Sequence, residues 1–227
     1  MNKQIVEIND FLKTYLDTNI GLRKNIVYLE FEKTFSKFIL LEKKRYTGLL
    51  TMKDGKEIYK IFSRGTEDAK KSTIKLSKKT YLELIDLVFN DAPVESIIEY
   101  IKKLRHHLFH DKIDLHELLL ITKVSKPIEF YKSLTLAARL AIRLIQEKKI
   151  LPIVESEKKV GTRLEYIVAN VHGKDAGLLL EEVKDNWNRT YYWEVQIYAP
   201  LQRVLTCTHP HIDWSKYETE FQQLTLL

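Results

Sequence analysis

The hydrophobic positions in the first part of the chain follow two different periods. Within residues 4–16 they recur every three or four residues, which is the spacing of one face of an amphipathic helix. From Val27 to Phe31 hydrophobic and polar residues alternate, and a β-like pattern continues to residue 62 with Asp54-Gly55 as a tight turn. We therefore predict an N-terminal helix followed by three antiparallel strands.

The rest of the chain is mainly helical in pattern, with short β-rich segments between the helices. The predicted helices are residues 69–89, 97–108, 133–149 and 190–206, the last one kinked or restarted near Pro200. The β-rich segments are residues 118–123 and 161–173. The predicted class is α+β: a small antiparallel sheet with an N-terminal helix in residues 1–64, then a mostly α-helical domain in residues 65–227.

Composition narrows the function classes only modestly. Hydrophobic residues make up 44% of the 227 residues, which is enough for an ordinary globular core. The net charge of +6 permits an anionic partner without establishing one. Cys207 is the single cysteine, so an internal disulfide and a cysteine-based zinc site are excluded, and an intracellular protein is expected. Export and a membrane span are not expected, because the sequence has no apolar segment of the required length.

Common catalytic signatures are absent from the sequence. It contains no Walker A loop, no GxGxxG, no GxSxG and no HExxH motif. His106 and His110 have the i, i+4 spacing that can chelate a metal on a helix, but no third ligand is evident. These histidines therefore have two interpretations, as metal ligands or as surface imidazoles.

The stretch LEFEKTFSKFILLEKKRYTG, residues 29–48, concentrates charge on predicted strands. Glu30 and Glu32 are expected on one strand face. The next strand is expected to carry the basic cluster Lys43, Lys44, Arg45 and Tyr46, with alternate side chains on opposite faces. One face of such a strand can meet phosphates. The alternative is a solvated edge strand, where lysines discourage pairing with other chains.

A series of segments then resembles family B DNA polymerases, in the same order as in that family. The segments are LEFEK, KKRYTG, SRGTEDAKK, DLHELLLITK, GTRLEYIVAN and TYYWEVQIYAPLQRVL, and the resemblance covers about residues 5–206. The chain is identified as similar to the C-terminal part of such a polymerase. The resemblance implies that residues 1–64 are the end of the palm and that residues 65–227 are the thumb.

The resemblance implies DNA contacts for individual residues. Those near the minor groove of the duplex would be Lys43, Lys44, Arg45, Tyr46 and Gly48, with Arg64 at the junction of palm and thumb. Those along the primer backbone would be Lys123, Thr162 and Arg163. Glu32 would lie at the edge of the metal site. Two departures from the family pattern occur. Many relatives have two arginines and an aspartate where this chain has Ser63-Arg64-Gly65, and Gly-Asp-Arg where it has Gly161-Thr162-Arg163, which keeps the cation but not the acid.

The family's YGDTD hairpin is absent from this sequence, so no catalytic residue is assigned to it. The resemblance therefore implies DNA-directed DNA synthesis only together with a large polypeptide that carries the exonuclease and the aspartates holding Mg²⁺. Primer-template DNA is the second implied partner, and the implied location is the site of DNA replication. The alternative is a non-catalytic remnant that binds nucleic acid or a polymerase. Gln223 and Leu226 in FQQLTLL faintly match a sliding-clamp peptide, or else form a plain tail.

Overall fold

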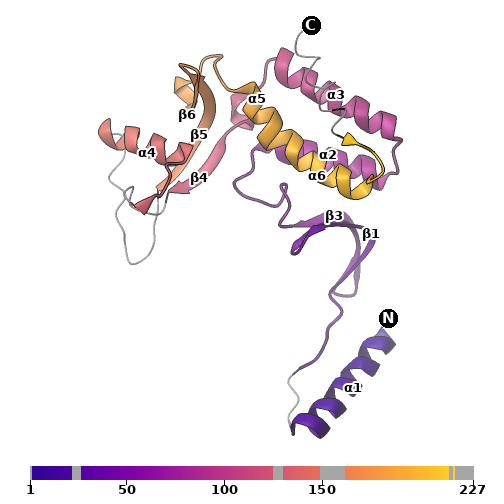
Figure 1. Ribbon diagram of the computed structural model, residues 1–227. Helices are drawn as coiled ribbons and strands as arrows, with labels where there is room; N and C mark the ends of the chain where they lie inside the picture. The colour runs from indigo at the N-terminus through magenta and orange to yellow at the C-terminus, as the bar shows by residue number, and fades with distance from the viewer. Residues whose placement is uncertain (1, 22–26, 125–129, 149–161, 215–216, 218–227) are drawn as a thin grey trace. The chain divides into compact units, whose positions relative to one another are not determined.

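The structure is a computed structural model that describes residues 2–21, 27–124, 130–148, 162–214 and 217 (Figure 1). The chain divides into two compact units. The first unit is Met1–Phe38 with Thr47–Phe62, and the second is Ile39–Tyr46 with Ser63–Leu227. Helices and two three-stranded sheets occur among the described residues, which confirms the predicted α+β class.

The first unit begins with helix α1, Asn2–Ile20, which confirms the predicted N-terminal helix and extends it at both ends. Part of its apolar stripe is exposed to solvent. Phe11 is 65% exposed and Tyr15 48% exposed, and their rings stack on each other with centroids 6.0 Å apart. Exposed apolar side chains on one helix face are typical of a surface that packs against something outside the described residues.

The first sheet has the order β1-β2-β3, with β1 at Lys33–Glu42, β2 at Arg45–Lys53 and β3 at Lys56–Arg64. The predicted turn between β2 and β3 is confirmed. Both of its residues have positive φ, 49° at Asp54 and 76° at Gly55, as a two-residue hairpin turn of the primed type requires. Gly48 lies inside β2, where a Cβ atom would come within 2.6 Å of the Phe35 ring, so this position requires glycine.

The alternating residues before Lys33 do not form a strand, contrary to the prediction. The backbone of Leu29 makes its hydrogen bonds with a side chain of α1 and not with a neighbouring strand. The Asn9 amide donates to the Leu29 carbonyl at 2.9 Å, and the Leu29 N–H donates to Asn9 at 2.7 Å. Glu30 and Glu32 consequently do not share a strand face.

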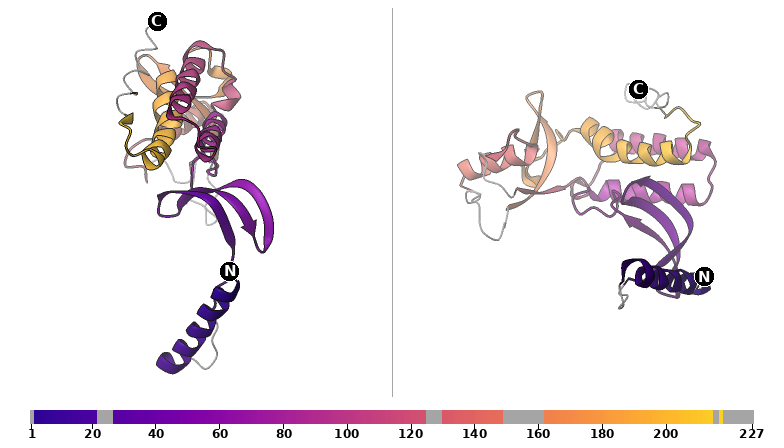
Figure 2. Two further views of the ribbon diagram at one scale, coloured as in Figure 1. Left: turned by 90° about the vertical axis from the view of Figure 1, so that its right-hand side faces the viewer. Right: turned by 60° about the horizontal axis from the view of Figure 1, so that its bottom comes forward.

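The second unit contains α2 at Lys75–Phe89, α3 at Val94–His110 and α6 at Ala199–Thr208. Figures 1 and 2 show these three helices lying together. Their core consists of fully buried side chains, among them Leu84, Ile85, Ile97, Ile101, Leu108 and Val204. The predicted helices 69–89 and 97–108 are confirmed, although α2 starts six residues later than expected because a turn at Thr66 precedes it.

A second sheet with the order β4-β5-β6 lies in the same unit, covered by α4 at Leu136–Gln146 (Figure 1). The strands are β4 at Leu120–Val124, β5 at Thr162–Val171 and β6 at Lys174–Leu178, and both pairings are antiparallel. Thr135 caps α4 by accepting a hydrogen bond from the Ala138 N–H at 3.2 Å. The two predicted β segments are confirmed, but β6 makes this region less helical than predicted.

The last helical stretch contains a π-helix, η4, at Tyr192–Tyr198, between the short α5 at Arg189–Tyr191 and α6. The predicted kink or restart near Pro200 is confirmed, because α6 begins at Ala199 with Pro200 in its first turn, directly after the irregular π-helix. Pro200 has no N–H to donate back into the preceding turn, and it lies in the first turn of α6, where that donor is not needed.

Two 3₁₀ turns complete the described elements, η1 at Leu115–Glu117 and η3 at Leu180–Glu182. In the part of the chain that the structure describes, no helix has both the length and the apolar composition needed to cross a bilayer.

Candidate nucleic-acid interface

The register of the second sheet places two predicted DNA contacts face to face. Lys123 of β4 lies directly opposite Arg163 of β5. Both side chains are exposed, whereas Leu164 and Tyr166 on the opposite face of β5 are buried. Like charges directly opposite each other on two strands destabilise a sheet. Glu165, which pairs with Arg163, offsets part of this repulsion, and a bound anion would offset more.

Three lysines from the segment before α2 and from its first turns join this pair. Together they form a basic groove of about 680 Å³, lined by Lys70, Lys71, Ser72, Lys78, Ile121, Lys123 and Arg163. Five of these seven residues are cationic and none is acidic. The sequence analysis missed Lys70, Lys71 and Lys78, although lysines recur throughout residues 70–79 and could have indicated a basic surface.

Two carboxylates at the border of the basic groove pair with its cations. Glu67 bonds Lys70 at 2.7 Å, and Glu165 bonds Arg163 at 3.0 Å. The Glu67 side chain is only 16% exposed, while those of Arg163 and Glu165 are more than half exposed. The exposed ion pair between Arg163 and Glu165 therefore contributes at most about 1 kcal/mol to the stability of the fold. Arg163 can therefore exchange its carboxylate for a phosphate at little cost.

The basic cluster of the first sheet differs in geometry from its prediction. Lys43 and Lys44 are the two turn residues between β1 and β2, so they do not alternate on a strand with Arg45 and Tyr46. Lys44 has a φ of 66°, and both turn lysines are exposed. Gly65 lies against this turn, and a Cβ atom there would be 2.6 Å from the Lys44 carbonyl oxygen. The glycine after Arg64 thus allows the turn to pack closely.

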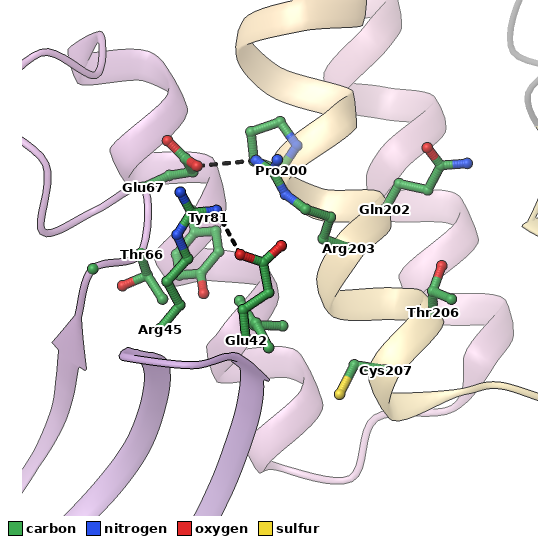
Figure 3. Close-up of a pocket in the computed structure, with 12 residues that line it drawn as sticks. Glu42, Arg45, Thr66, Glu67, Tyr81, Pro200, Gln202, Arg203, Thr206 and Cys207 are labelled. Carbon is green, nitrogen blue, oxygen red and sulfur yellow. Dashed lines mark hydrogen bonds and ion pairs between the residues drawn. The ribbon is translucent and has the colours of Figure 1, made fainter.

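Arg45 lines a pocket of about 350 Å³ at the base of this hairpin (Figure 3). Its guanidinium bonds Glu42 at 3.1 Å, and Arg203 of α6 projects into the same pocket. Tyr81 lies at the base of the pocket and is 1% exposed. Burial, with a smaller effect of Asp68, raises the pKa of Tyr81, so its hydroxyl keeps its proton.

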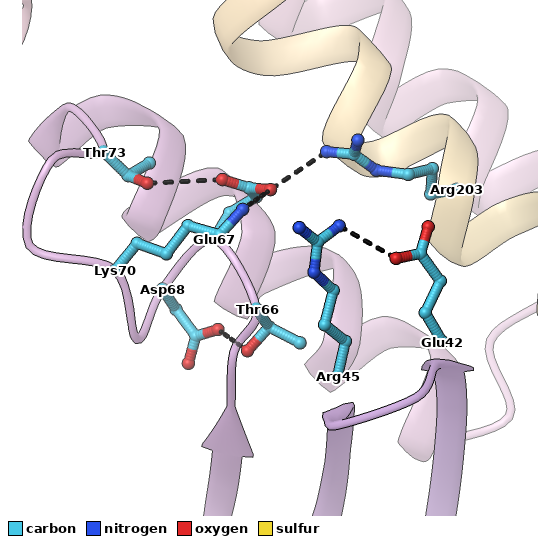
Figure 4. A network of polar contacts seen from close by, with 8 residues as sticks. All are labelled: Glu42, Arg45, Thr66, Glu67, Asp68, Lys70, Thr73 and Arg203. Carbon is cyan, nitrogen blue, oxygen red and sulfur yellow. Dashed lines mark hydrogen bonds and ion pairs between the residues drawn. The ribbon is translucent and has the colours of Figure 1, made fainter.

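Glu67 is the centre of a polar network beside this pocket (Figure 4). It accepts hydrogen bonds from Arg203 at 2.9 Å, from Lys70 at 2.7 Å and from Thr73 at 3.3 Å. Next to it, the Thr66 hydroxyl donates to Asp68 at 2.7 Å. This network fixes the segment that leads from β3 into α2, and with it the position of Lys70 at the basic groove.

The remaining predicted contacts lie elsewhere. Arg64 is exposed at the end of β3, and Gly48 is buried in the first unit. Thr162 is the first residue of β5, with its Cα opposite Val124. Gln223 and Leu226 lie outside the described residues.

The described residues do not fit a magnesium site. Glu32 is largely exposed, and its carboxylate pairs with Lys33. His106 and His110 lie with ring centroids 4.5 Å apart. Within the described ranges, no three histidine, cysteine, aspartate or glutamate side chains gather as metal ligands would.

Comparison with known proteins identifies the family. The sequence model of the family described as DNA polymerase family B matches residues 2–208. The chain belongs to DNA polymerase family B. This family B polymerase chain is 30% identical over 186 residues to a DNA polymerase delta catalytic subunit of Oryza sativa subsp. japonica, covering 78% of the chain and 16% of the relative. It is 25% identical over 187 residues to the delta catalytic subunit of Candida albicans, covering 80% and 17% respectively.

A solved structure supports the fold of this family B polymerase chain. The family B DNA polymerase of the archaeon Pyrobaculum calidifontis matches with a TM-score of 0.56 and 21% identity, over 86% of this chain and 24% of that one. At this identity the match establishes the fold alone. The chain spans about a sixth of the length of the delta catalytic subunits it matches.

Proposed function

We propose that this chain is the palm end and the thumb of a family B DNA polymerase, and that it holds primer-template duplex during DNA synthesis. In this proposal the palm part is residues 1–64 and the thumb is residues 65–227. The observation that carries it is the basic groove, in which Lys123 and Arg163 face each other beside three further lysines.

The chemistry of the basic groove suits a phosphate backbone better than a base edge. Five cationic side chains give strong, salt-dependent attraction to phosphates without reading sequence. Lys123 and Arg163 project from paired strands, so their spacing is fixed before DNA arrives. A grip of this kind serves a polymerase, which must hold every sequence equally well.

The exposed turn of the first hairpin supplies a second candidate contact. Lys43 and Lys44 form its tip and extend into solvent. We assign them, with Tyr46, to the duplex near its minor groove, where acceptors are similar for all base pairs. Arg45 forms an ion pair with Glu42 and lines the pocket at the base of the hairpin. It would either hold this turn in position or break the ion pair with Glu42 and contact the duplex.

Catalysis is proposed to depend on a polymerase portion outside this sequence. When bound, Mg²⁺ would activate the primer 3′-oxygen and neutralise charge on the nucleotide triphosphate. That portion would carry the aspartates that hold it, and it would cover the exposed apolar side chains of α1, such as Val6 and Phe11. A sliding clamp is a further proposed partner, through the tail that contains Gln223 and Leu226.

Primer extension tests the proposed dependence. The polymerase portion of the same organism that carries a YGDTD-like motif is assayed for primer extension with and without this chain. Addition of the chain is expected to raise extension at least about tenfold, because the basic groove adds phosphate contacts that hold the duplex. An equal rate with and without the chain contradicts a role in synthesis and favours a non-catalytic remnant that binds nucleic acid.

A further inference from the structure

A second cavity adjoins the basic groove, and its walls are mainly neutral polar groups. This polar pocket has a volume of about 360 Å³ and shares Lys70 and Ser72 with the basic groove. Its other polar lining residues are Glu67, Thr73, Thr122, Tyr166, Tyr191, Gln196 and Arg203. The two cavities are therefore neighbours on the second unit, one lined mainly by cations and the other rich in hydroxyl and amide groups.

The π-helix η4 builds one wall of the polar pocket. The Gln196 amide donates to the Tyr191 hydroxyl at 3.0 Å, although the two residues are five positions apart. In an α-helix, residues at this spacing point about 140° away from each other. The wider turn of a π-helix instead brings i and i+5 to the same face, and π-helical turns are often found at functional sites. The irregular turn thus places this pair in the polar pocket.

Strands β4 and β5 contribute the facing wall. The Thr122 hydroxyl lies 3.4 Å from the Tyr166 hydroxyl. Thr122 also directly precedes Lys123, so one strand supplies a neutral hydroxyl to the polar pocket and a cation to the basic groove. Successive side chains of a strand point to opposite faces, so β4 lines the two cavities from its two faces.

The charged groups of the polar pocket, Glu67, Lys70 and Arg203, form one hydrogen-bonded network with a net charge of about +1. Glu67 accepts hydrogen bonds from both Lys70 and Arg203, at 2.7 and 2.9 Å. Burial raises the pKa of Tyr191, so its hydroxyl stays protonated and can donate. Hydrogen bonds from neutral groups are accordingly what the pocket offers to a ligand. Phosphate and sugar oxygens in protein–DNA complexes accept such bonds from serine, threonine, glutamine and tyrosine.

We propose that the polar pocket binds the sugar–phosphate unit of the DNA strand adjacent to the phosphates in the basic groove. Gln196, Thr122 and Ser72 donate to its oxygens. The inference rests on the proposed function, because Lys70 and Ser72 line both the polar pocket and the basic groove, which points to a nucleic-acid strand as the ligand. It adds a neutral part to the grip, which contributes affinity without releasing counterions.

Binding of a fluorescent primer-template duplex to the full chain, measured by anisotropy over a range of salt concentrations, tests this proposal. Gln196→Ala and Thr122→Val are each expected to weaken binding about threefold to tenfold at every salt concentration, the loss of one hydrogen bond. The slope of log Kd against log salt is expected to stay unchanged, because no charge is removed. Gln196→Glu, which keeps the shape of the side chain, is expected to weaken binding more than Gln196→Ala because it repels phosphate.

The matched control is Gln146→Ala, an exposed glutamine on α4 outside the polar pocket, which is expected to bind as the wild type does. Thermal unfolding of each variant separates lost contact from lost folding, and only variants that unfold as the wild type does are compared. Wild-type affinity in Gln196→Ala, Gln196→Glu and Thr122→Val, with weakened binding in Lys123→Ala, overturns this inference and leaves the proposed function standing. Wild-type affinity in all four variants contradicts both.

Discussion

Replacing Tyr192 by phenylalanine is expected to lower the free energy of unfolding by about 2–4 kcal/mol, because two buried backbone groups lose their partner. The Tyr192 side chain is completely buried. Its hydroxyl donates to the Leu118 carbonyl at 2.9 Å and accepts from the Val168 N–H at 3.0 Å. One oxygen thus ties the π-helix to β5 and to the segment that leads into β4. Phenylalanine fills the same space and leaves both backbone groups unsatisfied.

Urea unfolding followed by circular dichroism measures this effect, with Tyr191→Phe as the matched control. Tyr191 is partly exposed, and its hydroxyl accepts a hydrogen bond from the Gln196 side chain at the wall of the polar pocket. Its replacement is expected to change the free energy of unfolding by less than about 1 kcal/mol. Equal stability of the two variants would contradict the role assigned to the Tyr192 hydroxyl.

Replacing both Lys123 and Arg163 by alanine is expected to weaken duplex binding by roughly 10-fold to 100-fold at moderate salt and to flatten its salt dependence. The two side chains face each other across β4 and β5, so the double variant removes one complete phosphate clamp. The slope of log Kd against log salt is expected to fall by about 2, close to 0.9 for each lost phosphate contact. Fluorescence anisotropy with the same duplex measures both changes.

Lys103→Ala controls for the general loss of positive charge. Lys103 lies on α3, is 76% exposed and pairs with Glu99 at 2.7 Å, away from the basic groove. Its removal is expected to leave both affinity and slope close to those of the wild type, because an exposed cation outside the contact surface is screened by salt. If Lys103→Ala weakens binding as much as a groove variant does, net charge rather than the basic groove accounts for the affinity.

Much of the fold could be predicted from local pattern. The helical spacing at residues 4–16 and the Asp54-Gly55 turn depend on neighbouring residues alone, and both occur as expected. The strand predicted from the alternation at residues 27–32 was wrong, because alternating residues form a strand only when another strand pairs with them. Strand β6, KDAGL, shows no alternation, and its pairing with β5 is what makes it a strand.

Only Lys123 and Arg163 among the five cations of the basic groove were predicted, and their geometry was not. Lys123 and Arg163 came from resemblance to the family, yet only the register across some forty intervening residues places them opposite each other. Lys70 and Lys78 were missed because lysines near a helix start are usually solvated. The π-helix could not be predicted from the sequence either, because it depends on how Tyr192 and its neighbours pack against β5.

The salt dependence of duplex binding by the wild-type chain tests the central claim most directly. We predict that log Kd for a primer-template duplex rises linearly with log salt, with a slope of about 4–5 if each of the five cations of the basic groove meets one phosphate. The slope and the affinity are expected to be the same for duplexes of unrelated sequence. A slope near zero, or no binding at low salt, would contradict the account of this chain as the part of a family B polymerase that holds the duplex.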